Sequence, residues 1–264
     1  MLDRVVIIDG DILAYQIAAR EEKPIHWGDG FWTLHVEQGP AEVALEERVL
    51  NVMDAVDADK VIIALSDDDH NFRKDIYPKY KSNRKGKRKP MILPVLKEFL
   101  AEEFDTFRRP GLEGDDVQGI LATSKVIVKA KERIIASLDK DMKTIPGLFY
   151  NFGKPEKGVV EISEDEADYW HLYQTLTGDT TDGYPGCPRV GPKNAERILA
   201  EHFDVSDDGI TLETSLEEAW AAVVAAFEKA KLGEEEALVQ ARVARILRAS
   251  DYDFKKRRPI LWKP

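Results

Sequence analysis

Three apolar runs rich in β-branched residues mark the first half of the chain. They cover residues 4–9 (RVVIID), 60–67 (KVIIALSD) and 133–141 (RIIASLDKD), and stretches with helical character separate them. Apolar strands that alternate with helices are typical of a parallel sheet whose two faces are both covered. A further short strand is expected near 104–108. The pattern therefore predicts an α/β fold with a mainly parallel central sheet flanked by helices.

The second half of the chain has mainly helical patterns. Residues 163–179 begin with the capping-box pattern of Ser163 and Glu166 and continue with apolar positions at helical spacing. A turn rich in glycine and proline follows, and a second helix is expected to start near Pro192, because proline is favoured at a first helical position. Later amphipathic stretches are expected to pack internally. We therefore divide the chain into residues 1–163 and 164–264.

Acidic residues follow the predicted strands at the point where each strand ends. They are Asp9, Asp67, Asp139 and Asp141, and the stretch GLEGDD adds Glu113, Asp115 and Asp116 after the fourth strand. Because the carboxyl ends of parallel strands share one edge of a sheet, these acids are expected to converge. Each acid alone is more simply explained as a helix cap or an acidic first turn. Together they would repel one another by roughly 1–4 kcal/mol per close pair, so a cation is expected among them.

The ligand chemistry of this acidic set indicates which cation it would hold. The stretch GDTTDG adds a further pair, Asp179 and Asp182. Carboxylate oxygens without nearby histidine or cysteine suit Mg²⁺ or Mn²⁺ better than zinc. Two such ions about 4 Å apart are the usual means of hydrolysing a phosphodiester.

Net charge changes the picture only when its distribution is considered. The chain has 38 Lys and Arg against 49 Asp and Glu, a formal net charge of −11, which by itself argues against a nucleic-acid binder. Yet nine basic residues and a single acid, Asp75, lie between Arg73 and Lys89. This concentrated positive segment is either a solvated loop or a contact for an anionic partner.

Composition sets the broad class of the protein. With 264 residues, 43% of them hydrophobic, the chain is long enough for one large domain or two ordinary ones. Its one cysteine, Cys187, excludes an internal disulfide framework and fits a reducing compartment. The run VVIIDG is too short for the core of a signal peptide, and no stretch approaches 18 apolar residues. We expect a cytoplasmic protein that does not associate with membranes.

The glycine-rich turn between the two helices is a candidate phosphate contact. In GCPRVGPKNA the backbone N–H groups at the start of the second helix, with Lys193, would approach a DNA phosphate. An ordinary connection between helices is the alternative.

Six stretches in a fixed order resemble the 5′ nuclease (flap endonuclease) superfamily. They are IDGD, ALSD, FRKDIYPKYKSNR, LEGDD, SLDKD and GDTTDGYPGCPRVGPKNA, and the similarity continues into the tail ARVARILRASDYDF. The chain is most similar to the 5′→3′ exonucleases of T-seven-like bacteriophages. The resemblance implies a PIN-like 5′ nuclease core with a two-metal acidic site, a basic arch at about residues 70–92, and a C-terminal helical region with a helix–three-turn–helix element.

The resemblance also implies roles for individual residues. The first metal would be held by Asp9, Asp67, Glu113 and Asp115, with Asp116 beside it, and the second by Asp139, Asp141, Asp179 and Asp182. The arch would supply Lys81 and Arg84 to the scissile phosphate and Tyr80 to the terminal base. The DNA backbone would be contacted by Arg73, Lys85, Lys87, Arg88 and Lys89, and by Gly186, Gly191 and Lys193 at the helical hairpin, where a K⁺ ion would also bind.

Two departures from the family pattern affect these assignments. The stretch SDDDHNF offers Asp67, Asp68 and Asp69 where the relatives need one ligand, and Asp67 is preferred because it ends the strand. In the helical hairpin, Arg189 stands where many relatives have glycine, at the turn whose carbonyl groups would hold the K⁺ ion.

The function implied is a metal-dependent 5′→3′ exodeoxyribonuclease of the infected bacterium's cytoplasm. It would act as a monomer on duplex DNA with 5′ ends, with flap cutting and RNA-primer removal from RNA–DNA hybrids as further activities, in phage replication, recombination and degradation of host DNA. A haloacid dehalogenase-type phosphatase, with Asp9 phosphorylated and Asp11 as acid, is one alternative, but it leaves LEGDD and the basic segment without a use. A non-catalytic DNA-binding module is another, but it has no need of the acid cluster.

Overall fold

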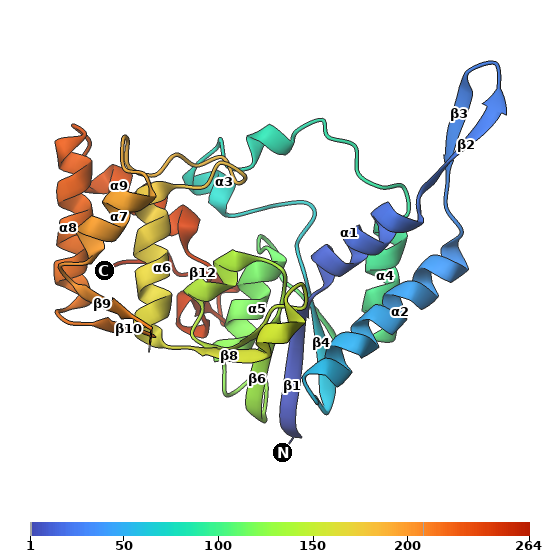
Figure 1. The fold of residues 1–264 in the computed structure, drawn as a ribbon, viewed down its shortest axis with the longest axis horizontal. Helices are drawn as coiled ribbons and strands as arrows, with labels where there is room; N and C mark the ends of the chain where they lie inside the picture. Colours follow the sequence, from blue (N-terminus) through green and yellow to red (C-terminus); the bar gives the residue numbers. More distant parts are fainter. Residues whose placement is uncertain (1, 208) are drawn as a thin grey trace.

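The computed structural model describes residues 2–207 and 209–264 and is built around one six-stranded sheet (Figure 1). The strand order is β5-β4-β1-β6-β7-β8. The strands are β1 (Leu2–Asp9), β4 (Lys60–Leu65), β5 (Thr106–Arg108), β6 (Ala130–Ala136), β7 (Gly147–Tyr150) and β8 (Val159–Ile162). All neighbouring pairs are parallel except β7 with β8. The predicted α/β class, mainly parallel sheet and fourth short strand are confirmed.

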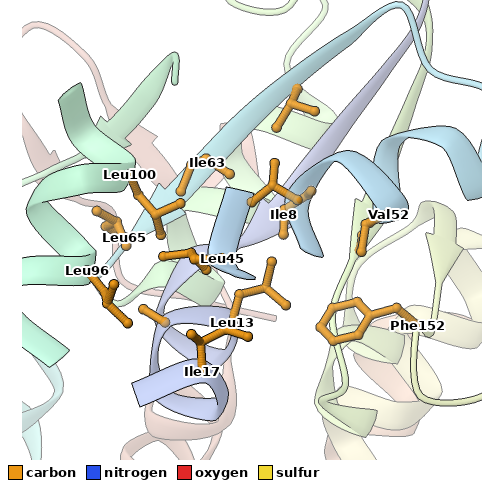
Figure 2. Close-up of a cluster of buried hydrophobic side chains, with 14 of the residues drawn as sticks. Ile8, Leu13, Ile17, Leu45, Val52, Ile63, Leu65, Leu96, Leu100 and Phe152 are labelled. Atoms are coloured by element: carbon orange, nitrogen blue, oxygen red, sulfur yellow. The ribbon is translucent and has the colours of Figure 1, made fainter. Parts of the chain in front are cut away.

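Side chains alternate along each strand, so each strand contributes residues to both faces of the sheet, and helices cover both faces. Ile8 and Ile63 face a core formed with α1 (Gly10–Glu21), α2 (Gln38–Ala55) and α4 (Leu93–Glu103), which Figure 2 shows. Ile7 and Ile135 belong to the core on the opposite face, formed with α5 (Gly114–Thr123). Residues 246–252 return to this second core. The C-terminal region is therefore joined to the sheet by shared packing.

The C-terminal helices pack around a third core. They are α6 (Glu164–Thr177), α7 (Pro192–Leu199), α8 (Leu216–Lys229) and α9 (Glu234–Ala244), with the antiparallel pair β9 (Phe203–Ser206) and β10 (Gly209–Leu212) beside them. As predicted, Ser163 caps α6, since its side chain accepts the N–H of Glu166 at 3.0 Å, and α7 starts at Pro192.

Short elements complete the fold. They are α3 (Arg73–Ile76), the 3₁₀ turns Ser82–Arg84, Lys140–Thr144, Pro155–Lys157 and Ala249–Asp251, and the paired strands β11 (Tyr252–Asp253) and β12 (Arg258–Pro259). Among the described residues, no helix is both long and apolar enough to span a membrane.

A β-hairpin that the sequence analysis did not predict projects from the body of the molecule. Strands β2 (Lys23–Gly28) and β3 (Phe31–His35) pair only with each other and extend away from α1 (Figure 1). Its turn is Gly28-Asp29-Gly30, and all three residues have positive φ. Trp27, Phe31 and Trp32 are largely exposed on it.

Candidate active site

A cavity of about 280 Å³ lies at the carboxyl edge of the sheet, where the sequence predicts the acids to converge. Seven acids line it, namely Asp9, Asp11, Glu113, Asp115, Asp139, Asp141 and Asp182, together with Ser66, Tyr80, Lys81 and Arg84. Six of the acids follow β1 and β6 or begin α5, so the parallel topology itself gathers them, whereas Asp182 comes from the turn after α6. The structure thus brings together six of the nine predicted metal ligands and adds Asp11.

Backbone hydrogen bonds fix the acids that end the strands. Asp9 ends β1 and caps α1, because its Oδ1 accepts the N–H of Ile12 at 3.0 Å, and its Oδ2 accepts the Ser137 hydroxyl at 3.2 Å. Asp139 caps the turn after β6 in the same way by accepting the N–H of Asp141 at 2.8 Å. Helix capping and cavity lining are therefore compatible uses of one carboxylate.

Burial and mutual repulsion perturb the acids at the centre of the cavity. Burial, reinforced by the Asp11 carboxylate, raises the pKa of Asp9 to about 7. Burial and the neighbouring Asp139 raise the pKa of Asp141 to about 7, and burial beside Asp9 raises the pKa of Asp115 well above its ordinary value. Oδ1 of Asp141 is buried and has no hydrogen-bond partner among the described residues. The pocket is therefore short of positive charge.

Four side chains of the basic segment line the cavity, namely Arg73, Tyr80, Lys81 and Arg84. Lys81 forms an ion pair with Glu113 and lies 3.5 Å from Oδ2 of Asp182, while Arg84 Nη2 lies 2.7 Å from Oδ1 of Asp182. Burial alone would raise the pKa of Glu113, but Lys81 and Arg73 beside it hold that pKa down to about 2. The cations beside Glu113 thus keep this acid ionised, whereas burial favours the protonated forms of Asp9 and Asp141.

Tyr80 is placed differently from the base-stacking role predicted for it. Its ring is only 3% exposed, and its hydroxyl lies 2.8 Å from Oε2 of Glu113 and 2.9 Å from Oδ2 of Asp182. A buried ring is not available to a DNA base in this conformation. The geometry instead makes Tyr80 a positioning residue for two carboxylates.

We expect Tyr80→Phe to lower the turnover number by about 10- to 100-fold, because the variant keeps the ring but loses a hydrogen bond to a charged group worth roughly 1.5–3 kcal/mol. Single-turnover cleavage of a 5′-labelled duplex would measure the effect. A stacking role predicts unchanged turnover in Tyr80→Phe, since phenylalanine stacks as well as tyrosine. Unchanged turnover in Tyr80→Phe together with a large loss in Tyr80→Ala would restore the stacking interpretation.

Arg73 and Asp116 do not lie where the sequence analysis expected them. Asp116 is fully buried and forms a two-point ion pair with Arg73, both contacts being 2.7 Å long. Arg73 is itself 2% exposed and also donates to the backbone oxygens of Val243 and Arg245. In this structure Arg73 lines the cavity but is engaged by Asp116, so the pair joins α3, α5 and the C-terminal segment, and the contacts of Arg73 with DNA and of Asp116 with a metal stay predictions.

Asp67 lies outside the cavity, as do Asp68 and Asp69. The Asp67 carboxylate accepts the N–H groups of Gly111 at 2.7 Å and Asp69 at 3.1 Å, so it shapes the loop that leads into GLEGDD. These hydrogen bonds lower its pKa. Asp68 pairs with Lys97. The predicted role of Asp67 as a metal ligand is therefore not supported by its position.

Asp11 and Ser66 are among the cavity residues that were missed as site residues, as are Gln174 and Tyr184. Oδ2 of Asp11 accepts the N–H of Ser66 at 2.7 Å, and Oδ1 lies 2.8 Å from Nζ of the buried Lys97. The motif IDGD could have identified Asp11, because a residue two positions after the end of a strand lies in the first turn of the helix that follows.

The glycine-rich turn is ordered largely by internal contacts. Asp179 accepts the N–H groups of Thr181 and Asp182, and it lies in a smaller pocket that also includes Asp141. Gly186 is buried with φ of +64°, and a Cβ there would stand 2.3 Å from the backbone nitrogen of Gly178. Its predicted DNA contact is thus corrected to a packing role. Arg189 adopts φ of +65°, so the tight turn forms despite the missing glycine.

The remaining basic residues are accessible. Lys85, Lys87 and Lys89 are exposed, Arg88 pairs with Glu22 at the base of the β2–β3 hairpin, and Gly191 and Lys193 are exposed at the start of α7. These positions can reach a large anionic partner.

The carboxylate ligands of the cavity fit hard divalent cations, although the acids do not converge on a single position in this conformation. All candidate ligands are carboxylates, which suit Mg²⁺ or Mn²⁺. In the part of the chain that the structure describes, no three Asp, Glu, His or Cys side chains stand ready to share an ion. Glu113 and Asp182 are held by Lys81 and Arg84 instead.

Comparisons with known proteins agree with this geometry. Residues 4–147 match the family described as the 5′-3′ exonuclease, N-terminal resolvase-like domain. The exodeoxyribonuclease of Enterobacteria phage T3 and the exonuclease of Escherichia phage T7 are each 31% identical, over 98% of this chain and 93% of their own length. The crystal structure of the T5 D15 protein with metal ions superposes with a TM-score of 0.65 at 15% identity, covering 91% of this chain and 89% of that one. The chain therefore belongs to the 5′-3′ exonuclease family and is a 5′→3′ exonuclease.

Proposed function

We propose that this exonuclease hydrolyses phosphodiester bonds near the 5′ ends of duplex DNA with the help of two divalent cations, Mg²⁺ or Mn²⁺. The observation that carries the proposal is the cavity itself, in which Asp9, Asp115 and Asp141 have raised pKa values and Lys81 and Arg84 stand at the rim. Carboxylates that repel one another in the free protein are suited to hold cations.

The acids divide naturally into two groups of ligands. Asp9 and Asp115, joined by Glu113 when Lys81 leaves it, would hold one ion, and Asp139, Asp141 and Asp182, with Asp179 behind them, would hold the other. Such ions activate water at neutral pH and stabilise the charge that develops on the leaving oxygen.

The protein's own contribution is to bind and orient the phosphate. Lys81 and Arg84 each pair with a carboxylate at the rim of the cavity. A scissile phosphate that enters the cavity would replace these carboxylates as the partner of both side chains. The Lys81 ammonium and the Arg84 guanidinium would then contact the phosphate as its charge grows. Tyr80 would keep Glu113 and Asp182 in place during the exchange.

Two surfaces would hold the duplex beside the cavity. The exposed lysines at 85, 87 and 89 would follow the sugar-phosphate backbone without reading sequence. The turn before α7, with Gly191 and Lys193, would act as a helix–three-turn–helix element on the duplex, and a K⁺ ion there is part of the proposal. Residues 1–163 would thus form the nuclease domain and 164–264 the DNA-gripping region of a monomer.

We expect replacement of Lys85, Lys87 and Lys89 by alanine to weaken DNA binding and to reduce its salt dependence. Each lost phosphate contact lowers the slope of log K against log salt by about 0.9, so the slope should fall by roughly 2 to 3. Fluorescence anisotropy with a short duplex at several salt concentrations would measure it. The matched control replaces Lys125, Lys129 and Lys131, which are exposed near the opposite end of β6. Equal slopes in both triple variants would show that Lys85, Lys87 and Lys89 do not contact the DNA.

The direct test of the proposed function is cleavage of one duplex labelled separately at its 5′ and 3′ ends. Mg²⁺-dependent release from the 5′ end, abolished by EDTA, is the expected result. An unpaired 5′ flap and an RNA–DNA hybrid would be tested beside it, because flap cutting and primer removal are parts of the proposal. Phage DNA replication, recombination and host DNA degradation are the processes that would use this activity. DNA binding without cleavage in Mg²⁺ or Mn²⁺ would contradict it.

Mg²⁺ should raise the melting temperature more at pH 8 than at pH 5. The folded-state pKa values of Asp9 and Asp141, about 7, lie above the ordinary value near 4. Protonation therefore stabilises the metal-free fold fully below pH 4, and this stabilisation is lost as pH rises through 7. Bound Mg²⁺ can supply a comparable stabilisation only at a pH at which the two carboxylates are ionised. Melting curves in Mg²⁺ and in EDTA at both pH values would measure the difference, and an equal Mg²⁺ shift at both would contradict the assignment.

A further inference from the structure

A second, larger hollow lies between α7 and α8. These two helices lie at the opposite side of the molecule from the projecting hairpin (Figure 1). Its volume is about 780 Å³, within the range of sites that hold ligands. The walls come from the turn before α7, from the face of α7 that carries Asn194, Arg197 and Ile198, from Glu201 just after α7, and from the C-terminal half of α8 with the two residues that follow it. It shares no residue with the catalytic cavity.

Cations dominate the rim of this hollow. Arg189, Arg197, Lys229 and Lys231 all line it and are exposed, while Glu201 is the only acid among the described residues that does. Within residues 2–207 and 209–264 none of the four takes part in an ion pair. In a chain with a net charge of −11, four unpaired cations around one concavity favour an anionic ligand.

The floor of the hollow is apolar and recessed. It is formed by Val190, Ile198, Ala222, Ala225, Ala226 and Ala230. A DNA duplex is a convex rod that contacts proteins through its phosphates, so it would leave such a floor unused. A peptide with both acidic and apolar side chains would use the rim and the floor together.

The backbone supplies an independent observation. Arg189 and Lys231 have φ of +65° and +62°, in the left-handed region that favours glycine. Lys231 follows the end of α8, where its N–H bonds to the carbonyl of Glu228 at 2.8 Å, in the place where helices commonly have glycine. Two cationic side chains thus stand over the hollow at positions where the backbone conformation disfavours any side chain. This cost points to a use for the side chains themselves.

We propose that the hollow between α7 and α8 binds an acidic peptide segment of a partner protein, one in which aspartate or glutamate alternates with apolar residues. The guanidinium groups of Arg189 and Arg197 would take carboxylates in two-point contacts. Lys229 and Lys231 would hold a second acidic position, and apolar side chains would fill the space above the alanines. The site would recruit the nuclease to its partner without occupying the catalytic cavity.

The experiment uses a fluorescein-labelled decapeptide of alternating aspartate and leucine, with two control peptides that contain asparagine for aspartate or serine for leucine. We expect saturable binding of the first peptide by fluorescence anisotropy, and at least about tenfold weaker binding of both controls. Lys231→Gly should weaken peptide binding by about tenfold while it leaves the melting temperature equal or higher and duplex cleavage unchanged. The matched control is Arg257→Gly, which removes a cation with φ of +53° outside the hollow and should not affect the peptide.

Three results would overturn the proposal. The first is no binding of the aspartate–leucine peptide to the intact protein. The second is equal affinity of the peptide for the Lys231→Gly and Arg257→Gly variants. The third is loss of duplex binding, rather than of peptide binding, in Arg197→Ala and Lys231→Gly, which would assign the hollow to DNA. None of these depends on whether the catalytic cavity holds metal, so failure here is separate from failure of the proposed mechanism.

Discussion

Asp139→Asn and Asp141→Asn should each reduce DNA cleavage by at least about 10³-fold, equivalent to roughly 4 kcal/mol of lost transition-state stabilisation. Each change removes one negative charge from the proposed second metal site and almost no volume. The fold should persist, because the amide oxygen of an asparagine at position 139 can still accept the N–H of residue 141. DNA affinity should stay within about threefold, since the lysines that face solvent are unchanged.

The melting temperature in EDTA distinguishes a lost ligand from a damaged fold. Asp141 carries a raised pKa because burial and Asp139 disfavour its ionised form, so either substitution should leave the metal-free protein equally or more stable. Asp69→Asn is the matched control, because Asp69 is an exposed acid that follows β4 outside the cavity. Near-normal turnover in both cavity variants, or an equal loss in Asp69→Asn, would show that the second metal site has been assigned to the wrong acids.

The sheet and the acids at its edge could be predicted because they depend on local sequence patterns. Apolar runs define the strands, parallel strands share one carboxyl edge, and Asp9, Asp139 and Asp141 follow from that rule alone. The β2–β3 hairpin was missed although Gly28-Asp29-Gly30 between aromatic residues is a recognisable turn signal. The phosphatase alternative is excluded by membership of the exonuclease family.

The side chains whose positions differ from those expected have partners far away in the sequence. Whether Arg73 faces DNA or the interior is decided by the backbone at residues 243 and 245, about 170 positions further on. Asp67 binds the N–H of Gly111, and Tyr80 binds Glu113 and Asp182. A resemblance of short motifs identifies which residues surround a site. It does not determine which of them face the cavity, because that depends on packing between separate segments.

Removing either member of the Arg73–Asp116 pair should destabilise the protein by about 3–5 kcal/mol, the largest stability effect expected at any single position. Both side chains are buried, and each oxygen of Asp116 lies 2.7 Å from the guanidinium. Asp116 also accepts the N–H groups of Glu113 and Leu247, each at 3.1 Å. Arg73→Ala would leave a buried carboxylate without its cation, and Asp116→Ala would leave a buried guanidinium with only the longer ionic contact to Glu113. Urea unfolding monitored by far-ultraviolet circular dichroism would measure both losses.

The double variant Arg73→Met, Asp116→Leu separates the penalty of an unpaired charge from the value of the pair itself. Two apolar side chains leave no buried charge, so its free energy of unfolding should recover by at least about 2 kcal/mol relative to the worse alanine variant. Cleavage should not recover with it, because Arg73 also lies 3.3 Å from Oε2 of Glu113 and helps to keep that acid ionised. Losses below about 1 kcal/mol in both alanine variants would mean that the pair is solvated in solution. The link between α3, α5 and residues 243–247 would then have to rest on apolar packing alone.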